Sequence, residues 1–473
     1  MGKNIRIYNT LSDKKDSFKP LNRKVINLFV CGPTVYDFSH IGHARTYIIF
    51  DSFAKYLKHI GFNVLYVQNI TDVDDKIIAR AREKSVLPKD LAEAFTKDYM
   101  KDMKLLGVTS VKKYAKATSY IKEIISQVTR LLEKKYAYYL EDGIYFDISK
   151  FKNYGKLSGR TVLQAEDSVS RIDYSKNKKN RGDFCLWKFN ENIEGEPSWP
   201  SPFGKGRPGW HIEDTAITEK FFGAQYDIHG GGRDLLFPHH EAEVAQMEAL
   251  SGKKPMAKYW MHTGFLTING QKMSKSLNNF ITIDHFLKQH SAQELRFWIV
   301  KNLWKSPMNY SELVMIEVKS ALEKIEEFLS KIKRIKSKNT TGSKSQTATL
   351  LQHTQKMFWE SLSDDFNTPK AFAVIFEFIK EANILLDNYA IDKKNASLIS
   401  QFFQEINQIF GIINFKKLNH SRIPDQVTQL VQQREHARNN TDWQKADELR
   451  IEIEKYGFSV QDSKEGPVIR KKL

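Results

Sequence analysis

The chain contains 473 residues, which is too long for one ordinary domain, and its net charge of +17 suits either a polyanionic partner or a solvated lysine-rich surface. No run of about 18 apolar residues occurs, and the first twenty residues lack an apolar stretch of signal-peptide length, so we expect neither a membrane span nor export. The two cysteines, Cys31 and Cys185, cannot build a disulfide framework, and they fit a reducing compartment, so we predict a cytoplasmic protein.

The N-terminal third alternates strand and helix patterns. A β-rich run from Val25 to Val30 ends at the chain-breaking Cys31-Gly32-Pro33, and a helical pattern follows from His43 to His59. Gly61 ends this helix, and Val64 to Val67 forms a second strand pattern. Strand, helix and strand at this spacing predict a βαβ unit, and therefore a Rossmann-type α/β fold with a doubly wound parallel sheet.

An insertion at about residues 125–210 is expected to split this sheet. Two strand patterns, Ala137 to Leu140 and Ile144 to Asp147, flank the turn-forming Glu141-Asp142-Gly143, which predicts a β-hairpin. Cys185 lies between Phe184 and Leu186, as a core cysteine would. Strand patterns of the main sheet resume at Tyr226–His229 and Tyr259–Thr263.

Helical periodicity dominates the chain from Ser311 onward. Two polar breaks, Lys336–Gln346 and Lys416–Asp425, interrupt it, and the second precedes a final helix pattern from Gln429 to Lys455. A pair of short strands is expected near Gly457–Val460 and Val468–Lys471. We therefore predict an α/β domain at 1–310, an α-helical bundle at 311–415 and a small C-terminal α/β module at 420–473.

His40 and His43 lie three residues apart at a predicted loop-to-helix junction, just beyond the first strand. This spacing places both imidazoles on the first helical turn, where free backbone N–H groups and the helix dipole favour phosphate. Gly42 lets a base or ribose approach the backbone closely. The alternative is an ordinary helix start with one capping and one solvated histidine, since a four-residue pattern is weak evidence alone.

Lys272 and Lys275 flank Met273-Ser274 and follow the turn-forming Asn269-Gly270. A loop of this kind can bring two ammonium groups onto a phosphate that gains charge in a transition state. A solvated basic loop is the alternative. The two patterns together, in this order and separated by a split βαβ domain, resemble the signature pair of class I aminoacyl-tRNA synthetases, which activate an amino acid with ATP and esterify it to tRNA.

Further segments resemble the cysteinyl members of that class, and the resemblance runs essentially end to end. They are Phe29 to Asp37, Asn69 to Lys76, Arg207 to Glu213, Asp227 to Gly232, Phe237 to Glu241 and Asp364 to Pro369.

Cys31, His239 and Glu243 offer sulfur, nitrogen and oxygen ligands, a mixture that zinc accepts readily. A zinc ion with an open position distinguishes a thiolate from a hydroxyl chemically, whereas an apolar pocket would contribute only about 1–3 kcal/mol. The family usually has a second cysteine where this chain has Asp214. Either Asp214 coordinates zinc through oxygen, which we favour and which makes the site harder, or three protein ligands remain.

The resemblance implies roles for further residues. Thr71, Trp210, His229 and Asp234 would contact the substrate, and Gly231 would join Gly42, His40, His43 and Lys275 in binding ATP. Arg438, Trp443, Asp447 and Asp462 match positions that read the anticodon, and arginines beside a tryptophan suit an unpaired RNA loop. An ordinary charged surface helix is the alternative for these four residues.

The implied reaction joins L-cysteine to tRNA(Cys) through a cysteinyl adenylate, with one zinc ion per chain and with magnesium accompanying ATP. No protein nucleophile is required, because positioning and charge stabilisation carry the catalysis. We expect a monomer. Two rivals remain: a ligase that joins cysteine to an amino sugar, for which an RNA-reading tail has no use, and a catalytically silent tRNA-binding paralogue, which would not need both signatures.

Overall fold

The computed structural model describes residues 4–160, 175, 177–190, 195–273, 279–335, 344–415, 425–463 and 466–471. The chain divides into two compact units, Met1–Ile413 and Asn414–Leu473. No helix among the described residues is long and apolar enough to cross a membrane.

A five-stranded parallel sheet forms the centre of the first unit, in the order β11-β10-β3-β4-β5. The two central strands, β3 and β4, are largely apolar and buried, as expected where helices cover both faces of a parallel sheet. The predicted Rossmann-type sheet is therefore confirmed. The strands are β3 (Val25–Val30), β4 (Asn63–Ile70), β5 (Lys113–Lys116), β10 (Tyr226–Gly232) and β11 (Ala257–Thr263).

Strand β3 pairs with β4 on one side and with β10 on the other, so the sheet order reverses at β3. Helix α1 (Ile41–His59) connects β3 to β4, and all but a few of its residues are buried. An open α/β sheet binds ligands beyond the carboxyl ends of its strands at such a reversal. Helices α2 (Asp75–Glu83) and α3 (Pro88–Leu105) connect β4 to β5.

The segment between β5 and β10 forms a separate layer built on an antiparallel sheet, β6-β7-β8-β9. The predicted hairpin is present, since Leu140 pairs with Gly143 across the Glu141-Asp142 turn. Cys185 is buried on β8, as expected of a core cysteine. The elements of this layer are η1 (Ala117–Tyr120), α4 (Ile121–Glu133), β6 (Ala137–Leu140), β7 (Gly143–Phe146), η2 (Ile148–Lys150), β8 (Phe184–Phe189), β9 (Gly206–Pro208) and α6 (Ile212–Phe222). After β10, the connection to β11 contains η3 (Arg233–Leu235), η4 (Leu236–His240) and α7 (Glu241–Ser251).

A small three-stranded sheet, β13-β12-β14, follows the main sheet. Strands β12 (Leu266–Ile268) and β13 (Gln271–Lys272) form a hairpin whose turn residues, Asn269 and Gly270, both have positive φ, at 49° and 78°. This is the backbone that asparagine and glycine favour in two-residue hairpins, so the predicted turn is confirmed. The third strand is β14 (Met308–Tyr310), and helices α8 (Ile283–Gln289) and α9 (Ala292–Val300) precede it in the chain. At the N-terminus, β1 (Arg6–Asn9) and β2 (Lys14–Ser17) form an antiparallel pair, and β1 packs against β11.

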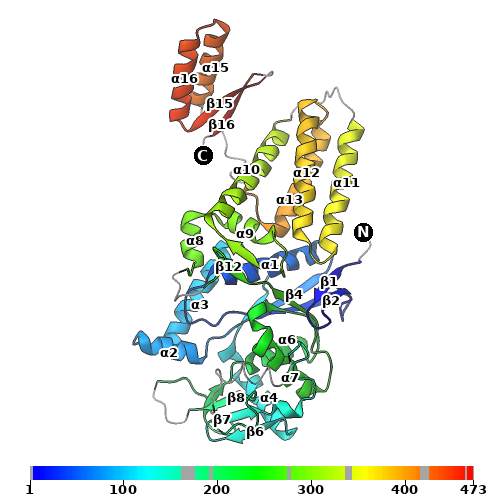
Figure 1. Cartoon of the computed structure of the whole chain (residues 1–473), viewed down its shortest axis with the longest axis vertical. Coiled ribbons are helices and arrows are strands. Elements are labelled where there is room, and N and C mark those ends of the chain that lie inside the picture. Colours follow the sequence, from blue (N-terminus) through cyan, green and yellow to red (C-terminus); the bar gives the residue numbers. More distant parts are fainter. Residues whose placement is uncertain are drawn as a thin grey trace. The chain divides into compact units, whose positions relative to one another are not determined.

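Four long helices complete the first unit as a bundle in which α11, α12 and α13 lie side by side (Figure 1). The side chain of Ser311 caps the first of them by accepting a hydrogen bond from the backbone of Val314, as expected of an N-cap serine. The helices are α10 (Glu312–Arg334), α11 (Lys344–Ser363), α12 (Thr368–Asp387) and α13 (Lys393–Phe410).

The second unit packs two helices, α15 (Asp425–Asn439) and α16 (Trp443–Lys455), against an antiparallel strand pair, β15 (Phe458–Ser463) and β16 (Gly466–Lys471). The predicted strand pair is confirmed, but the prediction of one helix from Gln429 to Lys455 is wrong. Thr441 has a φ of 57°, which a helix does not accept, and the side chain of Asp442 caps a new helix at the backbone of Lys445.

Candidate functional site

The sheet reversal brings three predicted site residues to one edge. Cys31 follows the last residue of β3, Thr71 follows β4, and Gly231 lies near the end of β10. The register aligns them, because Val30 pairs with Gly230 on one side and with Gln68 on the other. Helix α1 begins at the same edge, so the two histidines of its first turn are close to these strand ends.

His40 is the N-cap of α1, and its ring completes a capping box with His43. The His40 Nδ1 atom accepts hydrogen bonds from the backbone N–H groups of Gly42 at 3.1 Å and His43 at 3.3 Å, and His43 Nδ1 accepts from the His40 N–H at 3.4 Å. The rings stack with centroids 3.8 Å apart. A Cβ on Gly42 would lie 2.8 Å from the His40 ring, so in this structure the missing side chain makes room for that ring.

The capping box determines how the two rings carry their protons. Burial lowers the pKa of His40 to about 2, helped by His43, and lowers the pKa of His43 to about 4. Both rings are therefore neutral near pH 7, and each Nδ1 is an acceptor. A neutral imidazole carries one N–H, so both Nε2 atoms are donors. The helix start thus offers two oriented N–H donors without a positive charge.

The segments that flank Lys272 and Lys275 contact the start of helix α1. The Ser39–Ile41 segment bridges to the segment that follows the lysine loop: Ile41 N–H donates to Ile281 O at 3.1 Å, and Ile283 N–H donates to Ser39 O at 2.9 Å. On the other side of the loop, Lys272 is exposed at the end of the β12–β13 hairpin, and the Met273 side chain lies close to Gly42. Lys275 lies outside the described residues.

Three of the four predicted metal ligands, Cys31, Asp214 and His239, converge on one buried point, and Glu243 adjoins them through His239. The Cys31 Sγ atom lies 3.3 Å from Asp214 Oδ2 and 3.5 Å from His239 Nε2. His239 Nε2 also lies 3.0 Å from Asp214 Oδ2 and 3.1 Å from Glu243 Oε1. Ligands that surround one tetrahedral zinc ion at bond lengths of roughly 2.0–2.3 Å lie roughly 3.3–3.6 Å apart, so the cluster has nearly the spacing that an ion requires.

The donor set also has unsatisfied polar atoms. Asp214 and Glu243 are fully buried, and within the described part of the chain Asp214 Oδ1 and both Glu243 carboxylate oxygens lack hydrogen-bond partners. Burial, and then the Asp214 and Glu243 carboxylates, raise the pKa of the Cys31 thiol well above its ordinary value. A cation reverses this balance, because it stabilises the anionic form of each donor. The residues therefore fit a divalent metal, and zinc accepts this ligand mixture.

Outer residues orient the cluster. His211 Nδ1 lies 2.9 Å from His239 Nδ1, so it holds the ring nitrogen of His239 that faces away from the cluster, as an outer partner does for a metal-ligating histidine. Glu213, next to Asp214, is buried and accepts a hydrogen bond from the hydroxyl of Thr71. Sequence reasoning did not assign these two residues, although the His211-Ile212-Glu213-Asp214 run placed both beside a predicted ligand.

The predicted substrate residues divide into two groups. Trp210 stacks on the His239 ring with centroids 4.5 Å apart, so it forms a wall beside the cluster, and Thr71 contacts the same region through Glu213. His229 is fully buried next to Glu243, and its ring stacks on Trp260. Asp234 is exposed on η3, near Gly232. A Cβ on Gly231 would lie 2.7 Å from the His240 ring, so its nearest neighbour is a side chain.

Three family models match the chain in succession. Residues 17–320 match the class I (C) tRNA synthetase catalytic domain, residues 357–414 the DALR domain, and residues 420–470 the cysteinyl-tRNA ligase anticodon binding domain. The Cysteine--tRNA ligase of Methanococcus maripaludis strain S2 is 43% identical, with 99% of each chain covered. The corresponding proteins of Thermoplasma acidophilum (43%; 97% of this chain and 98% of the relative covered) and Thermococcus gammatolerans (41%; 98% of each) are similar.

The chain belongs to the cysteine–tRNA ligase family.

This ligase is therefore a class I aminoacyl-tRNA synthetase, and tRNA, ATP and an amino acid are its substrates. Solved methionyl-tRNA synthetases of Mycobacterium tuberculosis share its fold. One, in complex with methionyl-adenylate, aligns with a TM-score of 0.60 at 14% identity over 77% of this chain and 84% of that one. Another, also bound by methionyl-adenylate, aligns at 0.58 and 12% identity over 82% and 88%. These likenesses concern the fold alone.

Three of the predicted RNA-reading residues of the ligase lie together in the second unit. Arg438 donates to Asp462 at 2.8 Å, and its guanidinium lies 5.6 Å from the centre of the Trp443 ring. Arg434 donates to both carboxylate oxygens of Asp462. This contact is the main reason that the pKa of Asp462 is lowered. The Asp447 carboxylate is one of the acidic groups that raise the pKa of Arg434. Trp443 is exposed, so a base can reach its ring.

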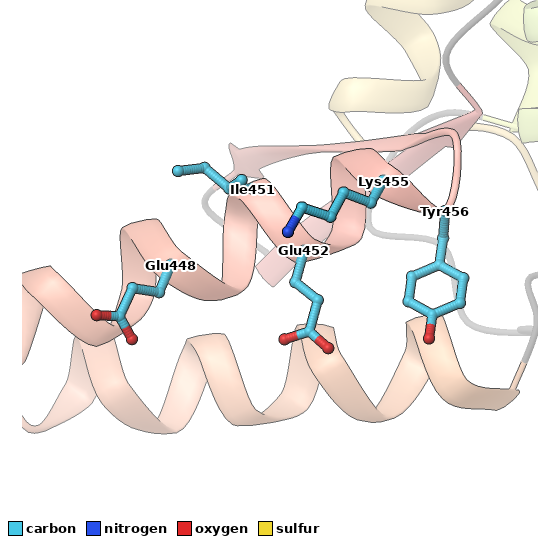
Figure 2. A pocket seen from close by; sticks show the side chains of 5 residues that line it. All are labelled: Glu448, Ile451, Glu452, Lys455 and Tyr456. Atoms are coloured by element: carbon cyan, nitrogen blue, oxygen red, sulfur yellow. The ribbon is translucent and has the colours of Figure 1, made fainter.

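A different face of α16 carries an open pocket (Figure 2). It is lined by Glu448, Ile451, Glu452, Lys455 and Tyr456. None of the predicted RNA-reading residues lines it.

The ligase should become unstable in mild acid because several buried histidines are neutral. Burial lowers the pKa of His40, His43 and His262 to about 2, 4 and 3, whereas an unfolded chain titrates them near 6.5. As the pH falls below 6.5, the unfolded chain binds protons that the folded chain excludes, so folding loses free energy. We expect the melting temperature to be level above about pH 7 and to fall steadily towards pH 5. A melting temperature that is flat over this range would contradict the assignment.

Proposed function

We propose that the enzyme activates L-cysteine to cysteinyl adenylate, transfers it to the terminal ribose of tRNA(Cys), and selects the substrate thiol with a zinc ion held by Cys31, Asp214, His239 and Glu243. The convergence of these four buried donors, two of them carboxylates with unpaired oxygens, carries this proposal. Bound zinc would coordinate a thiolate with an affinity that a serine hydroxyl does not match.

In the activation step, His40 and His43 direct their Nε2–H groups at the phosphates of ATP. Because both rings are neutral and held by the capping box, they donate without reorganising as charge develops. Gly42 and Gly231 line the nucleotide site. Lys272 and Lys275 bring positive charge to the departing pyrophosphate, and magnesium accompanies ATP as part of that substrate.

Around the amino acid, Trp210 closes the thiol pocket by covering the ring of His239. Thr71 holds Glu213 beside the cluster, His229 supports the cluster from below, and Asp234 contacts the amino group of cysteine. In the transfer step no side chain acts as a nucleophile, since the ribose hydroxyl attacks the adenylate. In the second unit, Arg438, Trp443, Asp447 and Asp462 read the anticodon.

We further propose a three-domain organisation at 1–310, 311–415 and 420–473, and a cytoplasmic monomer. The anticodon-domain match at residues 420–470 supports the tRNA ligase over an amino-sugar ligase. Cysteine-dependent ATP–pyrophosphate exchange tests for adenylate formation, and charging of tRNA(Cys) tests for transfer. Exchange without charging would favour the amino-sugar ligase, and the absence of exchange would favour a silent paralogue. Light scattering measures the oligomeric state.

Substitution of Asp214 by alanine should remove a zinc ligand. We expect zinc affinity to fall by at least about 100-fold, more than the 10–100-fold that loss of an outer-shell partner costs. Asp214→Cys, which supplies a thiolate in place of the carboxylate, is the matched control and should retain zinc. Zinc is measured by elemental analysis after equilibrium dialysis. Undiminished zinc in Asp214→Ala would leave Asp214 outside the ligand set.

A further inference from the structure

A second group of donors lies directly beside the proposed zinc ligands. His229 Nε2, His240 Nε2 and the carboxylate of Glu243 come within 4.8 Å of one another, and all three side chains are fully buried. His229 Nε2 lies 3.5 Å from Glu243 Oε2, and His240 Nε2 lies 4.0 Å from Glu243 Oε1. Among the residues that the structure describes, none of these atoms has a hydrogen-bond partner. Buried polar atoms without partners are rare in folded proteins and need an explanation.

The opposite ring nitrogen of each histidine is already held. The Nδ1 atom of His229 lies 2.6 Å from the Tyr226 hydroxyl. The Nδ1 atom of His240 lies 2.8 Å from His262 Nε2, and His262 Nδ1 in turn lies 2.8 Å from the Thr10 hydroxyl. Metal-ligating histidines show this arrangement, in which one nitrogen binds the ion and the other is oriented by an outer partner. The absence of a side chain on Gly231 leaves room for the His240 ring.

The charge of this region exceeds what one divalent ion balances. The Cys31 thiolate, Asp214, Glu243 and the adjacent Glu213 are four acidic groups, all buried. Among the described residues no lysine or arginine forms an ion pair with the three carboxylates. When all four groups are ionised, one divalent ion leaves a net negative charge in a buried site, where uncompensated charge is costly.

We propose that His229, His240 and Glu243 form a second divalent-cation site, which shares the Glu243 carboxylate with the first. Oε1 of Glu243 faces the first site, at 3.1 Å from His239 Nε2, and Oε2 faces His229. A carboxylate that bridges two ions through its two oxygens is a common feature of two-metal centres. Nitrogen and oxygen donors without sulfur suit zinc, cobalt or iron in the divalent state. This inference rests on the proposed function, because the first site is part of that proposal.

Cobalt distinguishes the two sites, since only the first contains a thiolate. The full-length enzyme is stripped of metal with a chelator and titrated with Co²⁺. The first equivalent should produce a sulfur-to-cobalt charge-transfer band, and a second should add only d–d absorption. Zinc returned by equilibrium dialysis should saturate at two ions per chain. Saturation at one ion per chain with the charge-transfer band present would overturn the second site alone; absence of that band would overturn the first.

Variants assign the second ion to its ligands. We expect His240→Gln to reduce saturation to one ion and to keep the charge-transfer band, whereas Cys31→Ser should lose the band. Two ions in His240→Gln would contradict the proposed ligand set. If His240→Gln fails to fold, His229→Gln provides the same comparison. Anomalous diffraction from the zinc-loaded wild type locates the ions without any substitution, and a single peak near Cys31 would overturn the proposal.

Discussion

Replacement of His40 by asparagine is expected to slow cysteine-dependent ATP–pyrophosphate exchange by about 10²–10³-fold while leaving the stability of helix α1 nearly unchanged. Asparagine is among the best N-cap residues, so it replaces the capping role of the His40 Nδ1 atom. It does not reach the position of Nε2, which is the donor that we assign to the phosphate. The measurement is kcat for exchange at saturating ATP and cysteine, together with the melting temperature.

His40→Ala is the matched comparison, because it removes both the cap and the donor. Its rate should fall as far as that of His40→Asn, but it should also lose about 1 kcal/mol of stability. If His40→Asn exchanges pyrophosphate at the wild-type rate, the histidine is a cap only, and the first of the two interpretations raised by its sequence position fails.

Replacement of Arg296 should lower the free energy of unfolding more than loss of the His40 cap does. This arginine on α9 is fully buried and connects three parts of the first unit: it pairs with Asp51 of α1 at 3.0 Å, donates to Leu106 O at 3.0 Å, and donates to Phe410 O at the end of α13. Loss of one partner of a buried pair leaves an uncompensated charge and typically costs about 3–5 kcal/mol. We expect Arg296→Met to lose about this much in urea unfolding.

Two features refine the Arg296 experiment. Lys55 also contacts Asp51, at 2.7 Å, so Asp51 keeps one cationic partner and the loss should lie towards the lower end of the range. Lys97→Met is the control, because it breaks an exposed pair with Glu93 on α3 and should change stability by at most about 0.5 kcal/mol. A loss below about 1 kcal/mol in Arg296→Met would show that the helix contacts do not depend on this pair.

Some features of this protein depend on short segments and could be predicted from the sequence. The apolar run Val25–Val30, the Asn269-Gly270 turn and the Leu140–Gly143 hairpin are each decided by neighbouring residues. The break at Thr441 and Asp442 is equally local, but it was missed because the flanking helical patterns are in register with one long helix. Its signal, an aspartate three residues before the backbone that it caps, was present in the sequence.

The family could also be predicted from the sequence. The histidine pair, the lysine pair and the segments that resemble cysteinyl synthetases are each continuous stretches of the chain. The assembly of the cluster did not follow from spacing. Cys31, Asp214 and His239 are far apart in the chain, and they meet because β10 pairs with β3 in a register that aligns Gly230 with Val30.

The tertiary structure alone decided which polar groups lack partners. Nothing local to His229 or His240 reveals that Tyr226 and His262 hold one ring nitrogen of each and leave the other facing Glu243. Likewise, the sequence allowed a capping histidine as an alternative at His40 and His43, but only the packing buried both rings and kept them neutral. Backbone patterns are set by near neighbours, whereas burial, protonation and unpaired donors depend on which distant segments pack together.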